Sequence, residues 1–237
     1  MGKRLIQQAR GKGGPTYRAP SFRYKGEAKY IPQNVETISG TVTDLIKCQG
    51  HSGPLAQIEY DNGDVCLMIA PEQIRVGDNV MAGNDAELER GNVLPLHNIP
   101  EGTLVFNLES VPGDGGKFVR SSGTFARVIS QMKDGVIVQL PSKKKKTFHP
   151  NCRASIGVIS SGGRKDKPML KAGVKYYAMK AKNKLWPSIS GNAQNAADHP
   201  FGNSRSQRKS KAKPAPKNAP PGRKVGMIRP RHTGRNK

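Results

Sequence analysis

The chain has 237 residues and a formal net charge of +23, from 40 Lys and Arg residues against 17 Asp and Glu residues. This excess of positive charge disfavours an ordinary metabolic enzyme and indicates a polyanionic partner. Hydrophobic residues make up only 35% of the chain, so we expect part of it to lack the apolar surface needed to fold alone, and we expect no membrane span or secretory signal.

The charges of the two signs are segregated along the chain. Residues 1–35 carry a net charge of +7 and residues 36–97 a net charge of −7. Residues 98–175 carry +9, and residues 176–237 carry +14. A general need for solubility does not separate signs in this way. We therefore predict four segments: a basic N-terminal extension, an acidic domain, a basic domain and a basic C-terminal extension.

Residues 1–35 form the first basic extension. They lack helical or strand periodicity and are interrupted by Gly and Pro, so we expect no regular structure in the absence of a partner. Tyr17, Phe22 and Tyr24 alternate with Arg18 and Arg23. Cations can neutralise phosphates while rings stack on exposed bases, so this pattern favours RNA binding over a solubilising tail.

Residues 36–97 have the composition of a small β domain. Strands are predicted over 37–46, 55–60, 65–69, 77–83 and 92–96, because apolar and β-branched residues alternate there between turn residues. Asn62-Gly63 between two apolar runs predicts a hairpin with a primed turn. Five short strands indicate an antiparallel barrel of the OB type. Because this segment is acidic, we expect its surface to face solvent or protein.

Residues 98–175 contain a second β domain. Strands are predicted over 103–108, 125–131, 136–140, 147–149 and 152–159, with a hairpin turn at Asp134-Gly135. The spacing suits an SH3-like barrel, although the pattern does not separate a barrel from a sandwich. Beyond residue 175 the pattern ends, and Gly, Pro, Asn, Ser, Lys and Arg dominate. We expect residues 176–237 to be an extension that lacks regular structure and folds against a large polyanion.

Two motifs have a phosphate-binding interpretation. The loop Pro112–Lys117 lacks the Gly-Lys-Ser/Thr spacing of a nucleotide-binding loop and no helix is predicted after it. Its backbone N–H groups are more plausible donors to an RNA phosphate. The run Lys143–Lys146 is interpreted either as a solvated hairpin tip or as a phosphate clamp without sequence specificity.

The acid-base and metal-binding candidates are weak. Asp198 and His199 are adjacent in a glycine-rich segment, but no nucleophile or second carboxylate accompanies them. The interpretation we favour is a histidine in a tight loop that hydrogen-bonds RNA. Cys48, Cys66 and Cys152 are far apart and form no CxxC motif, which disfavours a zinc or disulfide framework and suits a reducing cytosol. We predict no metal site and no cofactor, other than magnesium that a bound RNA itself holds nearby.

Several motifs resemble those of a known family. Residues 122–126 (Ser-Gly-Thr-Phe-Ala), 152–157 (Cys-Arg-Ala-Ser-Ile-Gly), 171–173 and 195–202 (Asn-Ala-Ala-Asp-His-Pro-Phe-Gly) are similar to motifs of the universal large-subunit ribosomal protein two family. The two ends of the chain resemble the archaeal and eukaryotic cytosolic branch. The chain departs from the family pattern at Lys143 and Lys144, at Gln194 and at residues 203–206, where a glycine run is common.

The resemblance implies a non-enzymatic, structural protein of the cytoplasmic ribosome, with an OB-fold followed by an SH3-like barrel. It implies rRNA binding that supports assembly of the peptidyl-transferase region, tRNA binding and subunit association. The implied partners are large-subunit rRNA, neighbouring ribosomal proteins, the small subunit at the interface and nearby tRNA, and no membrane. The residues we expect to contact rRNA are Lys3, Arg4, Arg10, Lys12, Tyr17, Arg18, Phe22, Arg23, Lys117, Arg120, Arg153, Arg164, Lys165, Lys171, Lys175, Lys180, Lys182, Trp186, Asn195, His199, Arg205, Arg208, Arg223, Lys224, Arg231 and Arg235.

Two alternatives belong to other functional classes. An RNA-processing hydrolase would use Asp198 and His199, and activity on naked RNA would reveal it. A nucleic-acid chaperone or translation factor would use the same two barrels, and it would leave ribosomes in moderate salt where a core protein stays bound.

Overall fold

The computed structural model describes residues 6–32, 37–132, 134–203 and 214–226. It divides the chain into two units, one formed by Ser21–Leu170 and the other by Met1–Pro20 together with Lys171–Lys237. We refer to these as the barrel unit and the extension unit. Among the described residues, no helix has the length and apolar character to cross a membrane.

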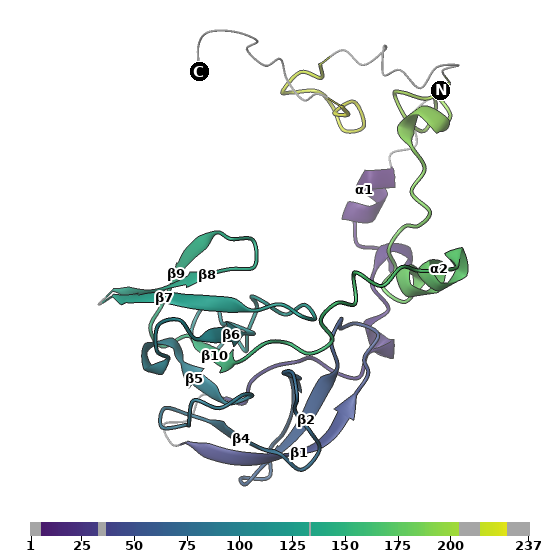
Figure 1. The fold of residues 1–237 in the computed structure, drawn as a ribbon. Helices are drawn as coiled ribbons and strands as arrows, with labels where there is room; N and C mark the ends of the chain where they lie inside the picture. The colour runs from purple at the N-terminus through teal and green to yellow at the C-terminus, as the bar shows by residue number, and fades with distance from the viewer. Residues whose placement is uncertain (1–5, 33–36, 133, 204–213, 227–237) are drawn as a thin grey trace. The chain divides into compact units, whose positions relative to one another are not determined.

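The barrel unit is built from ten strands in one continuous sheet (Figure 1). The first five strands are β1 (Ile38–Ile46), β2 (Leu55–Tyr60), β3 (Val65–Ile69), β4 (Asn79–Ala82) and β5 (Val93–Pro95). The other five are β6 (Leu104–Phe106), β7 (Ala126–Met132), β8 (Gly135–Gln139), β9 (Lys145–Phe148) and β10 (Arg153–Ile156). The order β3-β2-β1-β4-β5-β10-β6-β7-β8-β9 confirms a mainly β fold that fits an OB-type barrel followed by an SH3-like one.

Strand β10 connects the two barrels. It pairs antiparallel with β5 on one side and with β6 on the other, and all four of its residues are buried. Its sequence, Arg-Ala-Ser-Ile, alternates polar and apolar residues, but the strand is covered on both faces. The polar side chains of Arg153 and Ser155 are therefore buried, and both have hydrogen-bond partners in the core. Most other neighbours are antiparallel, whereas β4 and β5 pair in parallel.

The hairpin predicted at Asn62-Gly63 is present, but its turn is of a different type. Strands β2 and β3 pair antiparallel, with Glu59 opposite Val65. Gly63 has a φ of +83°, whereas Asn62 is not among the residues with positive φ. The Gly63 N–H donates to the Tyr60 carbonyl at 2.8 Å and the Tyr60 N–H donates to the Asp64 carbonyl at 3.0 Å. This is a three-residue turn with a left-handed glycine, so the predicted two-residue primed turn is wrong.

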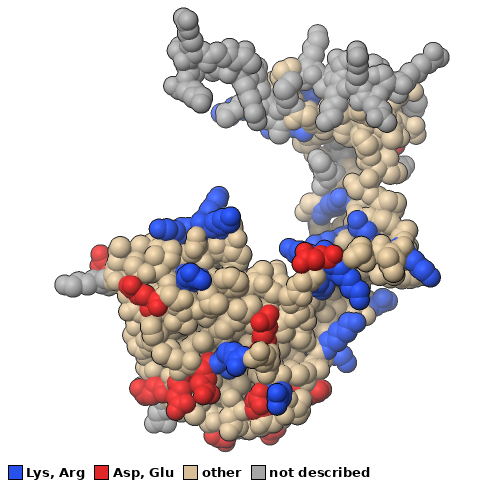
Figure 2. Space-filling model, in the orientation of Figure 1, with Lys and Arg blue, Asp and Glu red and all other residues tan. Residues whose placement is uncertain are grey.

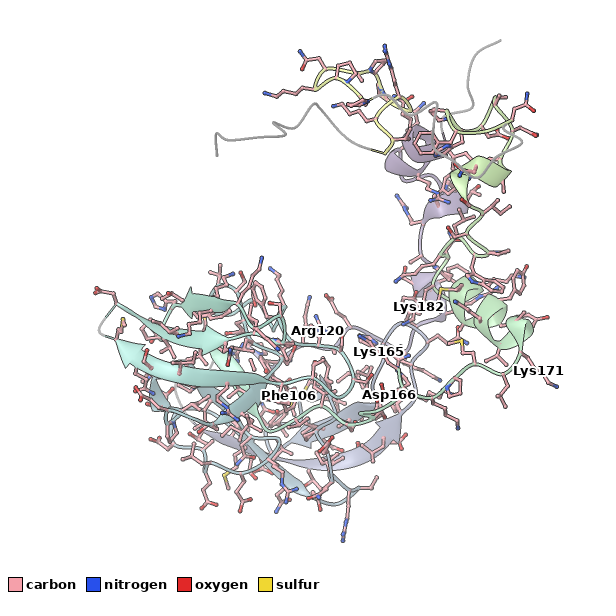
Figure 3. All side chains as sticks on the ribbon, turned by 45° about the horizontal axis from the view of Figure 1, so that its top comes forward. Phe106, Arg120, Lys165, Asp166, Lys171 and Lys182 are labelled. Carbon is pink, nitrogen blue, oxygen red and sulfur yellow. The ribbon has the colours of Figure 1, made fainter. Side chains whose placement is uncertain are left out.

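The interiors of the two barrels meet in a shared apolar cluster. The first barrel packs around Val42, Ile58 and Met68, and the second around Val105 and Val138. A third cluster contains residues from both halves of the sheet, namely Ala28, Cys48, Leu55, Ile69, Phe106 and Ile159. Figure 3 shows Phe106 inside this unit. The two barrels are therefore parts of one packed body.

The last residues of the predicted N-terminal extension belong to that body. Ala28, Tyr30 and Ile31 are buried. The Tyr30 hydroxyl donates to the Asn107 carbonyl at 2.7 Å and lies 2.8 Å from the Ser155 hydroxyl oxygen. Burial raises the pKa of Tyr30, so its hydroxyl stays protonated and can donate. The predicted N-terminal extension, residues 1–35, therefore includes residues of the core.

A buried ion pair joins the same elements. Glu109 is fully buried and the Arg153 side chain is only 8% exposed. The Glu109 carboxylate accepts from Arg153 Nη2 at 2.8 Å, from Nε at 3.1 Å and from the backbone N–H at 2.9 Å. It also accepts from the N–H groups of Gly113 and Gly115, while Arg153 Nη1 donates to the Ile31 carbonyl at 2.7 Å. One charged pair thus fixes the N-terminal segment, a loop and strand β10.

The extension unit contains little regular structure. Its α-helices are α1 (Ile6–Gly11) and α2 (Ala172–Lys180), and it has 3-10 turns at Pro15–Tyr17 and Gly191–Ala193. The barrel unit has 3-10 turns at Ser21–Arg23 and Leu96–Asn98. The sequence did not predict α2, because its apolar residues do not gather on one face and none of its residues is buried.

Replacing Arg153 should test how far the stability of the barrel unit depends on the buried ion pair between Glu109 and Arg153. Arg153→Met leaves the Glu109 charge buried without its partner, so we expect the free energy of unfolding to fall by about 3–5 kcal/mol. The control Arg127→Met removes an exposed arginine from β7 and should change stability by no more than about 0.5 kcal/mol. Denaturant unfolding of both variants checks this, and equal effects would contradict it.

Limited proteolysis should separate the two units. Residues 161–171 are exposed throughout and contain Arg164, Lys165 and Lys167. We expect trypsin to cut the protein in the absence of RNA in this segment and near Arg18 or Arg23, leaving a fragment close to Ser21–Leu170. Mass spectrometry of the resistant fragment checks the boundaries. Rapid cleavage between Ala28 and Glu109 would contradict the burial of the N-terminal segment.

Candidate nucleic-acid interface

Charge is segregated over the surface of the barrel unit. Figure 2 shows acidic side chains gathered around β1 and β4 and basic side chains over the β8–β9 hairpin. The exposed acids of the first barrel include Glu59, Asp61, Asp64, Glu72, Asp78, Asp85, Glu87 and Glu89. Such a surface repels phosphates, so the first barrel offers no RNA-binding face around these acids.

The hairpin lysines are solvent-exposed, and one of them contacts aromatic rings. Lys143 has a φ of +65° at the turn, and Lys145 and Lys146 begin β9. The Lys146 ammonium lies 4.0 Å from the centroid of the Phe118 ring and 5.0 Å from that of Phe148. These contacts hold one charge against the barrel while the others remain available to an anion.

In the extension unit, cations lie over aromatic rings. The distances from cation to ring centroid are 5.8 Å for Arg10 over Tyr17, 5.6 Å for Lys175 over Trp186 and 6.0 Å for Lys180 over Tyr176. In the barrel unit, Arg23 lies over the Phe22 ring, which is 82% exposed, at 5.3 Å. A ring beside a cation offers both stacking to a base and charge to its phosphate, as binders of single-stranded RNA do.

Asn183 organises the extension unit at the end of α2. It has a φ of +49°, and its N–H donates to the Lys180 carbonyl while the Lys184 N–H donates to the Met179 carbonyl. This pair of bonds is a Schellman cap, in which asparagine tolerates the left-handed conformation. The Asn183 side-chain amide then donates to the Thr16 carbonyl at 2.7 Å and to the Arg18 carbonyl at 2.8 Å. Asn183 therefore both ends the helix and binds the backbone of Thr16 and Arg18.

The segment around His199 folds into a compact loop. The Asn195 carbonyl accepts from the N–H groups of Asp198 and His199, both at 3.0 Å, and the His199 carbonyl accepts from the Gly202 N–H at 2.9 Å. Gly202 is buried, and a Cβ there would collide with backbone oxygens of the loop. A Cβ at Gly191 would lie 2.6 Å from His199 Nδ1. Glycine at these two positions is therefore required by close packing.

The orientation of the His199 ring is fixed from one side. The Phe201 N–H donates to Nδ1 at 3.1 Å, and the Phe201 ring lies edge-on at a centroid distance of 5.0 Å. An Nδ1 atom that accepts is unprotonated, so in the neutral ring the proton is on Nε2. Nε2–H is then the donor that the loop can present to an oxygen atom of RNA.

The predicted interface residues fall into three groups. Those described in the extension unit are Arg10, Lys12, Tyr17, Arg18, Lys171, Lys175, Lys180, Lys182, Trp186, Asn195, His199, Arg223 and Lys224. Figure 3 shows Lys171 and Lys182 near the two ends of α2. Those in the barrel unit are Phe22, Arg23, Lys117, Arg120, Arg153, Arg164 and Lys165. Outside the described residues lie Lys3, Arg4, Arg205, Arg208, Arg231 and Arg235.

The structure argues against an RNA contact by Arg153. Its guanidinium is buried and bonded to Glu109 and Ile31, so it serves the fold. Arg120 is half-buried and donates to the carbonyls of Gly116 and Ala28. The sequence did not distinguish these arginines from surface ones because Ala28, Ile31 and Glu109, which supply most of their acceptors, are distant in the chain. We therefore exclude Arg153 from the candidate interface.

In the loop Pro112–Lys117, backbone N–H groups donate to carboxylates of the protein itself. The interpretation of this loop as a phosphate-binding loop is therefore corrected. Gly113 and Gly115 donate to Glu109, and Gly116 donates to Asp114 at 3.1 Å. Partial burial alone would raise the pKa of Asp114, but bonds from nearby N–H groups and from Lys117 lower it below its ordinary value. The carboxylate therefore stabilises the loop at neutral pH, and this contribution is lost as the pH falls through the lowered pKa.

Sequence reasoning missed Tyr176 and Asn183. Tyr176 follows Lys175 and precedes Tyr177, and the two tyrosine rings pack edge-on at 5.4 Å. The same alternation of cation and ring that marks the N-terminal segment is present here. Asn183 had no signal of its own, because its role depends on the left-handed cap and on a partner 167 residues away.

Two of the cysteine thiols are held in their protonated form. Burial raises the pKa of the Cys66 and Cys152 thiols to about 11, so both stay protonated near neutral pH and are poor nucleophiles. Within the described ranges, no group of three His, Cys, Asp or Glu side chains is arranged to hold a metal ion.

Comparison with known proteins assigns the family. Residues 89–219 match the family model "Ribosomal Proteins L2, C-terminal domain". The chain is 52% identical over 234 residues to large ribosomal subunit protein uL2 of Archaeoglobus fulgidus, covering 99% of both chains. It is 48% identical to the uL2 proteins of Methanococcus aeolicus and Halorubrum lacusprofundi, covering 99% of this chain and 100% and 98% of theirs. These matches confirm the resemblance seen in the sequence motifs: the chain belongs to the uL2 family of large ribosomal subunit proteins, in its archaeal form.

Proposed function

We propose that this chain binds large-subunit rRNA chiefly through its extension unit and uses its barrel unit as a scaffold. As a uL2 family member it is a structural constituent of the large subunit of the cytoplasmic ribosome. The observation that supports this division of labour is the contrast in charge: cations lie over rings in the extension unit, whereas the first barrel exposes at least eight acids. Phosphate attraction favours the first surface and opposes the second.

The more specific roles rest on the family resemblance. They are primary binding to rRNA, support of peptidyl-transferase centre assembly, tRNA binding and subunit association. The structure supports them in one respect: the His199 loop is held by its own hydrogen bonds, so it can present Nε2–H to RNA in a fixed direction. Neighbouring ribosomal proteins, the small subunit and tRNA are the other partners in this proposal.

A structural role without catalysis is part of the proposal. The family is structural, the Cys66 and Cys152 thiols are protonated, and His199 Nδ1 is already engaged by a backbone N–H. Magnesium enters the proposal only as ions that rRNA holds between its own phosphates. A catalytic part for His199 is the alternative, and the loop geometry permits a direct test of it.

Charge reversal should locate the RNA-binding face. Arg10→Glu with Arg18→Glu removes two positive charges from exposed positions of the extension unit and adds two negative ones, so the affinity for an rRNA fragment should fall. The slope of log affinity against log salt should become shallower by about 0.7–0.9 for each phosphate that the variant no longer neutralises. Filter binding over a range of salt concentrations measures both quantities.

The matched control reverses acids of the first barrel. Glu87→Lys with Glu89→Lys should leave the affinity unchanged or slightly raised, because both residues are exposed on the acidic surface. A larger loss of affinity in this pair than in the arginine pair would show that the first barrel carries the RNA-binding face, and the proposal would fail.

His199 should matter for assembly more than for chemistry. His199→Gln keeps an N–H donor and should largely preserve subunit assembly and activity, whereas His199→Ala should impair assembly or tRNA placement. If His199 were a general acid-base group, its removal would instead lower the rate of the chemical step by ~10²–10⁴-fold. Single-turnover peptide release with a small aminoacyl analogue, on purified and fully assembled subunits, separates the two. A loss beyond ~10²-fold in correctly assembled His199→Ala subunits would establish a direct catalytic role.

A further inference from the structure

The extension unit contains a cavity between its two chain segments. The cavity has a volume of about 590 Å³ and is lined by side chains from both the N-terminal segment and the region of α2. Its aromatic lining consists of Tyr17, Tyr176 and Trp186, and its cationic lining of Arg10, Lys180 and Lys184. A volume of this size is in the range of pockets that take small organic ligands.

The cavity is held open by contacts that leave its rings accessible. Asn183 ties α2 to the carbonyls of Thr16 and Arg18, which fixes the distance between the two walls. Tyr17 and Tyr176 remain 40% and 44% exposed. An aromatic surface left partly open in this way, beside three cations, is suited to receive a planar group.

The chemistry of the lining specifies the ligand. Around this cavity the described lining residues carry three positive charges and no negative one, so an anion is favoured. Three rings favour a flat, π-rich group beside that anion. A nucleotide combines the two, because its base can stack while its phosphate is neutralised.

We propose that this cavity takes a single unstacked nucleotide of rRNA, with its base among Tyr17, Tyr176 and Trp186 and its phosphate near Arg10, Lys180 or Lys184. The inference rests on the proposed rRNA-binding function and adds a defined nucleotide site to it. A base within a regular duplex is covered on both faces by its neighbours and cannot enter. The site therefore recognises a single-stranded or bulged position, where one base is turned out of the stack.

The test uses the full-length protein and its own fluorescence. Trp186 is the only tryptophan of the chain, so its emission reports on this cavity. The probes are a single-stranded oligoadenylate of about ten nucleotides, within the usual site sizes of single-strand binders, and a blunt RNA duplex with the same number of phosphates. Both are titrated at raised salt, so that general phosphate attraction is weakened.

Stacking should quench Trp186 on the single strand and much less on the duplex. Tyr176→Ala should weaken single-strand binding by about 5- to 100-fold and leave duplex binding nearly unchanged. Val174→Ala is the control, because Val174 also lies on α2, is 57% exposed and does not line the cavity. Tyr176→Phe keeps the ring and should bind like the unmodified protein, which excludes a general folding defect.

Three results would overturn the inference in distinguishable ways. Equal quenching by the two RNAs would show that no base enters the cavity. Equal losses of affinity in Tyr176→Ala and Val174→Ala would show that the cavity ring has no special part. In both cases rRNA binding by the protein would still stand. Failure of the unmodified protein to bind either RNA would instead overturn the proposed function and this inference together.

Discussion

The buried pair of Glu109 and Arg153 holds the barrel unit together. One carboxylate accepts five N–H groups, from the Arg153 side chain and backbone and from two glycines of the loop. A buried charge is costly unless it is paired and fully hydrogen-bonded, so this arrangement tolerates little change in the surrounding backbone. The same guanidinium donates to the Ile31 carbonyl, and this bond fixes the buried residues around Ile31 in the core. The scaffold is therefore complete without RNA.

The extension unit has a different source of order. None of the residues of α2 is buried, and the cations along it repel one another. Its contacts are cation–ring pairs and backbone hydrogen bonds such as those of Asn183 and the His199 loop. Each is worth little in water, and a polyanion that neutralises the charges adds the missing stabilisation. We infer that the barrel unit serves as the folded scaffold and that the extension unit makes contact with RNA.

The sequence was informative where the signal is local. Alternating apolar residues located each strand to within a few residues, and motifs such as Asp198-His199-Pro200 led to the family. It failed where partners are far apart in the chain. Arg153 looked like a surface cation until its contacts with Glu109 and Ile31 were visible. The loop glycines looked like phosphate ligands until their N–H groups were found on Glu109 and Asp114. Asn183 had no local signature, because the carbonyls that its side chain binds belong to Thr16 and Arg18 at the other end of the chain.

Hydrogen–deuterium exchange on the full chain, alone and bound to a large-subunit rRNA fragment, tests this division of labour most directly. Amides of β8 and β10 should be protected in both states, because the scaffold needs no RNA. Amides of Ala172–Lys184 and of residues 191–203 should gain protection only when RNA is bound. Protection gained instead over the acidic surface of β1–β4, with no change in α2 and the His199 loop, would contradict the account.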